Sequence, residues 1–219
     1  MSESTFLWHD YETFGANPRY DRPCQFAFLR TNLALEPIEP PSILYCQPTL
    51  DVLPDPTACS ITGITPQYAQ AHGDPEPRFA QQIYDVMSRP GTCVVGYNNL
   101  RFDDEVTRHL FWRNFLNPYQ REFANGNSRF DLINVLRLTR ALRPEGIEWV
   151  DYDDGRPNFR LEDLARANGL DIECAHDALV DVRATLELAR LIKTRQPKLF
   201  EYALTLRDKN TVLGMLAIG

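Results

Sequence analysis

The chain has 219 residues, of which 43% are hydrophobic and 24% are charged. This is enough apolar material for a full core and argues against global disorder. The formal net charge of −7 argues against a protein that simply coats nucleic acid, but it allows an enzyme with an acidic metal site and a local basic patch.

The first part of the sequence predicts three strands. Residues 5–10, 24–31 and 42–47 are rich in aromatic and β-branched residues, and a Pro/Glu-rich turn separates the second from the third. Short connections favour a meander at one side of a sheet. A loop is expected at 53–57, followed by a short helix with Pro66 in its first turn.

The second part predicts strands and helices in alternation. A buried strand is expected at 92–98 and helices at 78–89, 103–115, 161–169, 177–195 and 199–206, while 128–143 begins extended and becomes helical and 151–158 is a surface turn. We therefore predict a single α/β domain, a mixed central sheet flanked by helices.

The cysteines and the first residues of the sequence favour a cytoplasmic protein. The five cysteines include no C-x-x-C pair, and the start MSEST has no secretory signal pattern. No apolar run approaches the ~18 residues that would span a bilayer. We expect a cytoplasmic, monomeric protein that does not contact membranes.

Carboxylates occur where a core would not place them. The stretch HDYETFG (9–15) puts Asp10 and Glu12 on the same side of a strand, where a cation, a proton or water is expected between them. Asp103 follows GYNNLRF at the exit of the fourth strand. Asp181 lies on an otherwise small and apolar helix face, where a lone carboxylate is costly without a partner.

Each of these residues also has a structural interpretation. A D-x-E pair is common, and Asp103 is a natural first-turn acid of a helix. Its neighbours Asp104 and Glu105 could fill that role instead. His176 could be an ordinary loop histidine.

Taken together, the four acids favour a metal site. Strand exits cluster at one edge of an open sheet, and a helix laid across that edge could add Asp181. Oxygen ligands favour Mg²⁺, with Mn²⁺ as a substitute, over zinc. Such a site serves two-metal phosphodiester hydrolysis, with ions ~3.5–4 Å apart. His176, five residues before Asp181, could accept the proton of the attacking water.

These residues resemble a known family. The order D-x-E, N-x-x-x-F-D and H-x-x-x-x-D is similar to the signature of the DEDDh 3′→5′ exonucleases, which have an RNase H-like fold. The segments DRPCQFAF, ITGITPQ, GYNNLRFDDEVTR, ALRPEGIEW, FRLEDLARANG and HDALVDVRAT resemble bacterial exonuclease I, a family of single-strand-specific deoxyribonucleases, over nearly the whole chain.

The resemblance implies roles for individual residues. Asp10, Glu12, Asp103 and Asp181 match the metal-binding carboxylates, with Asp10 bridging two Mg²⁺ ions, and His176 matches the general base. Glu12 is also expected to contact substrate. Arg160, in FRLE, matches a phosphate-holding position, and a surface ion pair with Glu162 or Asp163 is the less favoured alternative.

A basic and aromatic segment is predicted to hold the DNA strand. Residues 106–143 contain seven arginines against only Glu122 and Asp131, locally +5, with aromatic rings between them. Phe111, Trp112 and Phe115 are expected in the core because they follow helical spacing. The expected strand contacts are Arg108, Tyr119, Phe123, Arg137, Tyr202 and Lys209, with Gly63 and Ile64 near the terminal base.

The expected activity is 3′→5′ hydrolysis of single-stranded DNA to 5′-mononucleotides, in DNA repair or recombination. The alternatives are an exoribonuclease that trims RNA ends and a non-catalytic single-strand-binding module that docks partner proteins. The family also implies binding of the acidic tail of the single-strand-binding protein. Family members continue into SH3-like and helical domains, so we expect 1–219 to be the exonuclease domain alone, which leaves processivity open.

Overall fold

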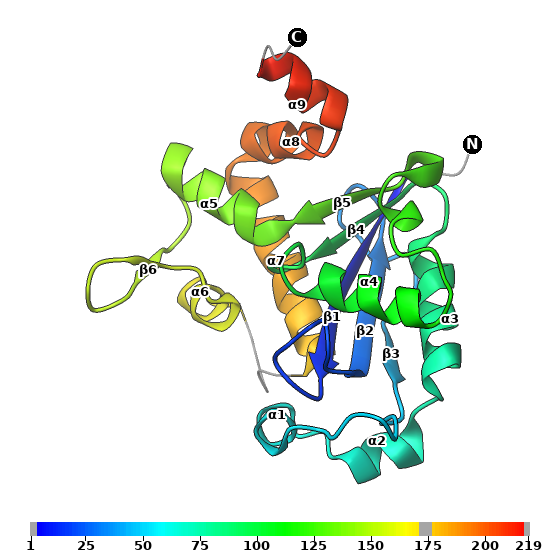
Figure 1. Cartoon of the computed structure of the whole chain (residues 1–219). Helices are drawn as coiled ribbons and strands as arrows, with labels where there is room; N and C mark the ends of the chain where they lie inside the picture. Colours follow the sequence, from blue (N-terminus) through cyan, green and yellow to red (C-terminus); the bar gives the residue numbers. More distant parts are fainter. Residues whose placement is uncertain (1–3, 171–176, 217–219) are drawn as a thin grey trace.

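A five-stranded mixed sheet forms the centre of the molecule (Figure 1). The structure is a computed structural model that describes residues 4–170 and 177–216. The strands, in the spatial order β3-β2-β1-β4-β5, are β1 Thr5–Thr13, β2 Pro23–Thr31, β3 Ser42–Tyr45, β4 Thr92–Gly96 and β5 Ser128–Asp131. The first three strands pair antiparallel, whereas β4 and β5 run parallel to β1. The predicted meander and the mixed sheet are confirmed.

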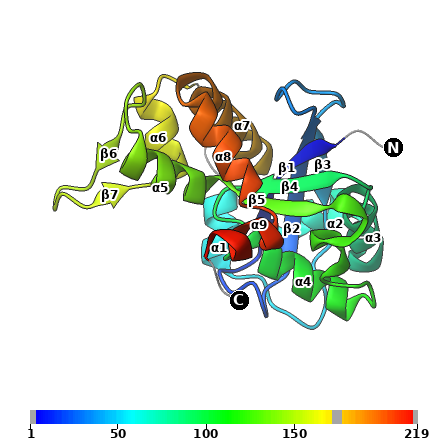
Figure 2. The ribbon, with the colours of Figure 1, turned by 90° about the horizontal axis from the view of Figure 1, so that it is seen from above.

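Helices cover both faces of this sheet. They are α1 Pro56–Thr62, α2 Pro66–His72, α3 Glu76–Met87, α4 Asp103–Arg113, α5 Leu132–Leu142, α6 Leu161–Ala167, α7 Ala178–Arg195, α8 Pro197–Thr205 and α9 Lys209–Met215. Seen from above, α3 and α4 lie on one side of the sheet and α5, α7 and α8 on the other (Figure 2). A small hairpin, β6 Val150–Asp151 and β7 Pro157–Asn158, lies beside α6.

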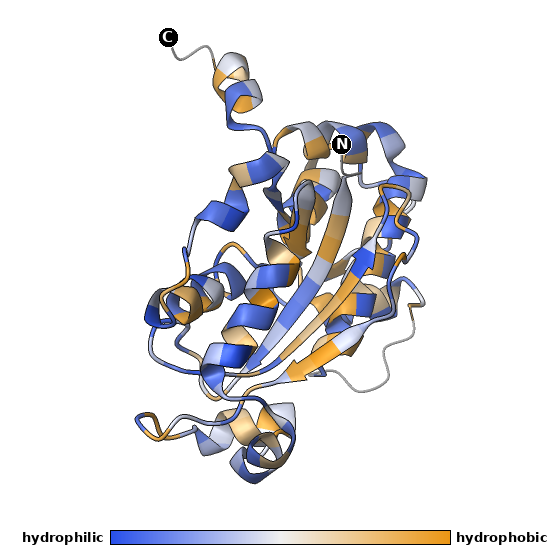
Figure 3. Ribbon diagram, turned by 90° about the vertical axis from the view of Figure 1, so that its right-hand side faces the viewer, coloured by the Kyte–Doolittle hydropathy of each residue, from blue (hydrophilic) through white to orange (hydrophobic). Residues whose placement is uncertain are grey.

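Strand alternation divides the core into two layers. Phe6 and Trp8 of β1 belong to the apolar cluster shared with α5, α7 and α8, whereas Leu7 and Tyr11 belong to the cluster shared with α3 and α4. The apolar residues along the strands are visible in Figure 3. Asp10 and Glu12 have the same parity as Phe6 and Trp8, so their side chains point to the α7 face.

The carboxyl end of β1 extends beyond its parallel neighbour. β1 pairs with β4 only from Thr5 to Trp8, but with β2 as far as Thr13. The prediction that the strand ends at residue 10 was therefore too short. Asp10 and Glu12 lie inside a paired strand, which fixes their spacing and direction.

Two helix predictions were incomplete. Residues 53–57, expected as a loop, lead into α1, because Asp55 accepts a hydrogen bond from the Thr57 N–H and Pro56 starts the helix. The helix α9 was not predicted, although the Asp208 side chain caps it in the same way. In the part of the chain that the structure describes, no helix is long and apolar enough to cross a membrane.

The expected burial of three aromatic residues on and after α4 is right for only one of them. Phe111 is fully buried, but Trp112 is 72% exposed and Phe115 is 99% exposed. Adjacent residues lie about 100° apart around a helix, so Phe111 and Trp112 cannot both face the core. Phe115 follows the end of α4 with a left-handed backbone (φ 59°), which turns its ring outward.

Candidate active site

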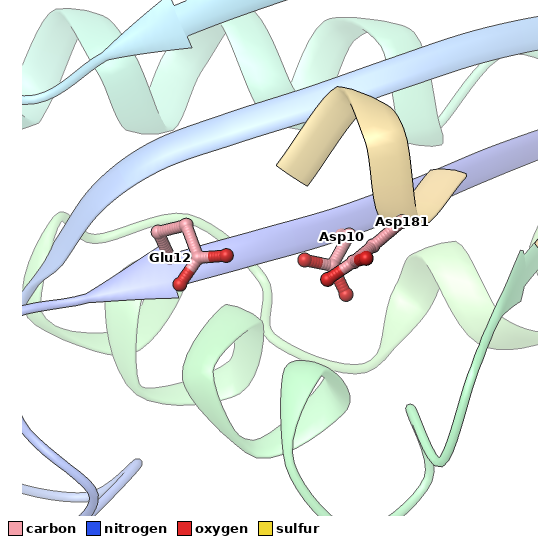
Figure 4. Close-up of side chains that lie close together, drawn as sticks. All are labelled: Asp10, Glu12 and Asp181. Atoms are coloured by element: carbon pink, nitrogen blue, oxygen red, sulfur yellow. The ribbon is translucent and has the colours of Figure 1, made fainter. Parts of the chain in front are cut away.

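Three of the predicted acids meet at the carboxyl end of β1. One carboxylate oxygen each from Asp10, Glu12 and Asp181 lies within 4.8 Å of the other two (Figure 4). Asp10 and Glu12 project from β1, and Asp181 projects toward them from α7. Residues some 170 positions apart in the sequence thus form one group.

The start of α7 places Asp181 in this group. The side chain of Asp177 caps the helix by accepting the Leu179 N–H at 2.9 Å. Ala178 and Val182 are buried in the cluster between α7 and the sheet. Asp181 lies one turn beyond Ala178 and next to Val182, on the side of the helix that faces β1.

Asp103, the fourth predicted acid, lies beside these three. It is the first residue of α4, it is buried, and its Oδ1 accepts the Tyr11 N–H at 3.2 Å. This N–H is available because β4 stops pairing with β1 at Trp8. Asp103 is not one of the three acids that converge within 4.8 Å of one another.

Burial and neighbouring acids raise the pKa of three of these carboxylates. Burial is the largest cause for Asp10, and repulsion from Asp103, Asp181 and Glu12 adds to it, so the pKa of Asp10 stands well above its usual range. Burial and the charges of Asp181 and Asp103 raise the pKa of Glu12 to about 8. Burial likewise raises the pKa of Asp103 to about 7.

A divalent cation fits this donor set. The converging atoms are carboxylate oxygens, the ligands that Mg²⁺ and Mn²⁺ prefer, and they repel one another unless positive charge lies between them. Asp10, Glu12 and Asp181 would hold the ion, with Asp103 at its side. The predicted base His176 lies outside the described residues.

Asp104, adjacent to Asp103, has arginine partners. Its Oδ1 lies 2.7 Å from Nη2 of the buried Arg121, and its Oδ2 lies 2.8 Å from Nη1 of Arg129. Burial alone would raise the pKa of Asp104, but the two arginines lower it below its usual value. Asp104 thus has a structural role, as the sequence suggested, and Asp103 is available for the site.

The predicted basic groove is partly neutralised by acids from elsewhere in the chain. Arg113 pairs with Glu76 and Arg140 with Asp151, in addition to the pairs of Arg121 and Arg129 with Asp104. Counting charges within 106–143 therefore overstated the basic character of this surface. The partners were missed because they lie outside that segment.

Arg108, one of the two preferred phosphate contacts, is tied to protein carboxylates. Its guanidinium pairs with Glu122 at 2.9 Å and also with Glu105, and it lies over the ring of Tyr119. Arg137, the other preferred phosphate contact, is exposed. Its guanidinium donates to the Asn134 side chain at 3.1 Å and lies over the ring of Phe159.

The remaining predicted strand contacts lie at or near the surface. Tyr119 and Phe123 are 54% and 71% exposed. Tyr202 is exposed on α8, and Lys209 begins α9 next to Phe123 in a shared surface hollow. Arg160 forms an ion pair with Glu162, which is the alternative that the sequence favoured less.

A pocket of about 170 Å³ lies near the acids. Gly63 and Ile64, predicted to meet the terminal base, line it together with Gln25, Tyr45, Thr62, Tyr68 and Asp177. Gly63 has a left-handed backbone, and Ile64 is largely buried in a small cluster with Phe14. Gln25 and Tyr45 were not singled out from the sequence, although Gln25 is a lone amide in the apolar run CQFAF.

Acids at the end of the first strand and on a helix laid against it characterise a class of nuclease domain with an RNase H-like fold. The family model RNase_T, described as "Exonuclease", matches residues 7–189. The chain belongs to this exonuclease family.

Within the family, the chain is similar to exodeoxyribonuclease I. The protein of Escherichia coli strain K12 is 52% identical over 216 residues, which cover 99% of this chain and 46% of that protein. The exonuclease I structure from Methylocaldum szegediense is 57% identical, with a TM-score of 0.94 over 99% of this chain and 46% of that one. E. coli exonuclease I in complex with a dA16 oligonucleotide is 53% identical, with a TM-score of 0.94 over 97% of this chain and 46% of that one. The chain spans about half the length of these relatives.

Proposed function

We propose that this chain is a Mg²⁺-dependent exonuclease that hydrolyses single-stranded DNA from the 3′ end to 5′-mononucleotides, in DNA repair or recombination. The observation that supports this most directly is the convergence of Asp10, Glu12 and Asp181, with Asp103 beside them. Structures of E. coli exonuclease I with dA16 and dT13 oligonucleotides support single-stranded DNA as the substrate.

The residues of the chain have distinct tasks in this proposal. Asp10, Glu12 and Asp181 bind the cations, and Asp103 orients the site through its contact with the Tyr11 N–H. Bound Mg²⁺ would activate the attacking water and stabilise the charge on the leaving oxygen. His176, which directly precedes the cap of α7, takes the proton of that water. Glu12 also contacts the terminal nucleotide.

Aromatic and basic side chains hold the strand. The exposed rings of Tyr119 and Phe123 can stack on bases, which does not require a particular sequence. Arg137, Arg160 and Lys209 meet phosphates. Arg108 already pairs with Glu122, so its main contribution is to hold the ring of Tyr119 in place.

We also propose that the chain binds the tail of the single-strand-binding protein. A complex named ExoI/SSB-Ct is known for a protein 52% identical to this chain. A surface hollow of about 520 Å³ between α5 and α8 is lined by Arg143, Lys198 and Tyr202 together with apolar side chains. Its two cations suit an acidic peptide, which makes this hollow the better assignment for Tyr202 than a contact with the substrate strand.

A single digestion experiment tests polarity and cation dependence together. Matched single-stranded DNA oligonucleotides labelled at the 3′ or the 5′ end are digested with Mg²⁺ and with EDTA. We expect the 3′ label to be released first as a mononucleotide, and no release in EDTA. Release from the 5′ end, turnover in EDTA, or faster digestion of the matching RNA would contradict the proposal.

A further inference from the structure

Gln25 is a buried amide near the start of β2, within the apolar run CQFAF. It is 2% exposed, and its register partner on β1 is Glu12. It shares the α7 face of β2 with Ala27, which belongs to the cluster packed against that helix. A polar side chain in such surroundings destabilises the fold unless both its donor and its acceptor are satisfied.

Both ends of this amide have a partner. The Oε1 atom accepts the Ala178 N–H at 3.2 Å, and the Nε2 atom donates to the Tyr45 hydroxyl at 3.1 Å. Ala178 is the first residue of α7, so its N–H is one of those that have no acceptor within the helix. The side chain of Asp177 satisfies the next N–H, that of Leu179.

Gln25 therefore joins the start of α7 to the strand pair that bears the acids. Asp181 lies three residues beyond Ala178, and His176 lies two residues before it. Asp10 and Glu12 lie on β1, which pairs with β2 at Gln25. A displacement of the helix start by ~1 Å would change the spacing between Asp181 and Asp10, and reactions at such sites are sensitive to shifts of that size.

We propose that Gln25 is a positioning residue: its bond to Ala178 sets the start of α7, so that Asp181 meets Asp10 and Glu12 at the spacing that a divalent cation needs. The effect on hydrolysis rests on the proposed function, whereas the effects on the helix and on cation binding do not. A glutamine suits this place because it supplies the acceptor without adding a fifth negative charge next to Glu12.

The chain offers a matched control for this role. Asn127 is also a buried amide that bridges two backbone segments, with Oδ1 accepting the Thr92 N–H at 3.0 Å and Nδ2 donating to the Met87 carbonyl at 3.3 Å. It directly precedes β5 and bonds to the first residue of β4, at the end of the parallel strands opposite the acids. Each substitution thus removes a buried bridging amide: Gln25→Ala removes one near the acids, and Asn127→Ala removes one far from them.

The test compares these variants by titration calorimetry with Mg²⁺ and by hydrogen–deuterium exchange of peptides from 177–185. Both variants should unfold at a lower temperature than the parent. Only in Gln25→Ala should the backbone amides at the start of α7 exchange ~10-fold faster and Mg²⁺ bind ~10-fold more weakly. In the same variant, kcat should fall by a larger factor than KM changes. Gln25→Glu keeps the acceptor and should restore slow exchange.

Tyr45→Phe removes only the hydroxyl that holds the amide, and it should give a smaller shift in the same direction; it also serves as the test if Gln25→Ala does not fold. Equal Mg²⁺ affinity and equal exchange in Gln25→Ala and Asn127→Ala would overturn the proposal. If the parent bound Mg²⁺ but did not hydrolyse DNA, the proposed function would fail while the positioning role would still be tested.

Discussion

Asp103 and Asp104 are neighbours in the first turn of α4, but their carboxylates have opposite electrostatic surroundings. Asp103 lies among other acids, and burial raises its pKa to about 7. Asp104 lies between Arg121 and Arg129, which lower its pKa in spite of burial. Asp104 has its positive counter-charges within the chain, whereas a bound cation could supply them on the side of Asp103.

This difference separates a structural network from a functional site. The acids around Arg121 are neutralised by arginines of the same chain, so they stabilise the fold without a ligand. The acids around Asp10 repel one another, which stores unfavourable energy that a divalent cation can relieve.

The largest effect is expected from Asp10→Asn. Removing a central cation ligand should lower the rate of hydrolysis by ~10⁴-fold, about 5 kcal/mol of transition-state stabilisation. The same variant should unfold at a higher temperature than the parent in EDTA, because it relieves repulsion. Single-turnover digestion and thermal unfolding measure the two effects, and Asp153→Asn on the exposed β6–β7 hairpin is the control. An active variant, or one that is less stable in EDTA, would contradict the account.

Asp104→Asn should have the opposite effect on stability. It leaves the buried guanidinium of Arg121 with only the more distant Glu122, 3.8 Å away, as a charged partner, and the loss of such a buried pair typically costs ~3–5 kcal/mol. Urea unfolding with and without Mg²⁺ should show the same loss in both conditions. Glu105→Gln, which removes a half-exposed partner of Arg108, should cost less than ~1 kcal/mol. A loss at Asp104 no larger than at Glu105 would mean that the network does not stabilise the fold.

The stabilisation by Mg²⁺ should grow with pH. Without the ion, Glu12 keeps its proton in the folded chain up to a pKa of about 8, while the unfolded chain loses it near 4.5. Between these values the folded state binds more protons, so its stability falls as pH rises, and the ion should offset this loss. Because Glu12 is partly exposed, we expect the gain from Mg²⁺ to be only roughly 2 kcal/mol larger at pH 8 than at pH 5.

Thermal unfolding across this range, with and without Mg²⁺, measures the gain. A gain independent of pH would show that the acids are already ionised in the folded chain without the ion.

The smallest effect is expected at the strand contacts. Phe123→Ala should raise KM for single-stranded DNA by roughly tenfold, about 1–2 kcal/mol for one stacked base, with kcat little changed. Phe115→Ala removes an even more exposed ring that we do not assign to the strand, and it is the control. Steady-state kinetics on one oligonucleotide compares them, and equal effects would remove Phe123 from the strand path.

The acids of the site could be predicted from the sequence because each breaks a local pattern. Asp10 and Glu12 interrupt the apolar alternation of a strand, and Asp181 interrupts the apolar face of a helix. The hydrogen bond from Tyr11 to Asp103 could not be predicted, because it depends on β4 ending before β1 does.

Other contacts depended on residues distant in the sequence. The arginines of 106–143 find acids such as Glu76 and Asp151 only after the chain has folded, so counting local charge overstated the basic surface. Gln25 could be noticed in the sequence as a single amide within CQFAF, but its hydrogen-bond partner Ala178 lies 153 residues away. These ion pairs and this hydrogen bond join residues that are distant in the sequence, so local patterns could not predict them.

Titration calorimetry of Mg²⁺ into the metal-free chain near pH 7, in buffers of different ionisation enthalpy, tests the central claim most directly. The account predicts saturable binding with release of protons, because the raised pKa values of Glu12 and Asp103 must fall when the ion binds. It also predicts that Asp181→Asn weakens this binding strongly. Binding that is absent, or that is unchanged in Asp181→Asn, would contradict it.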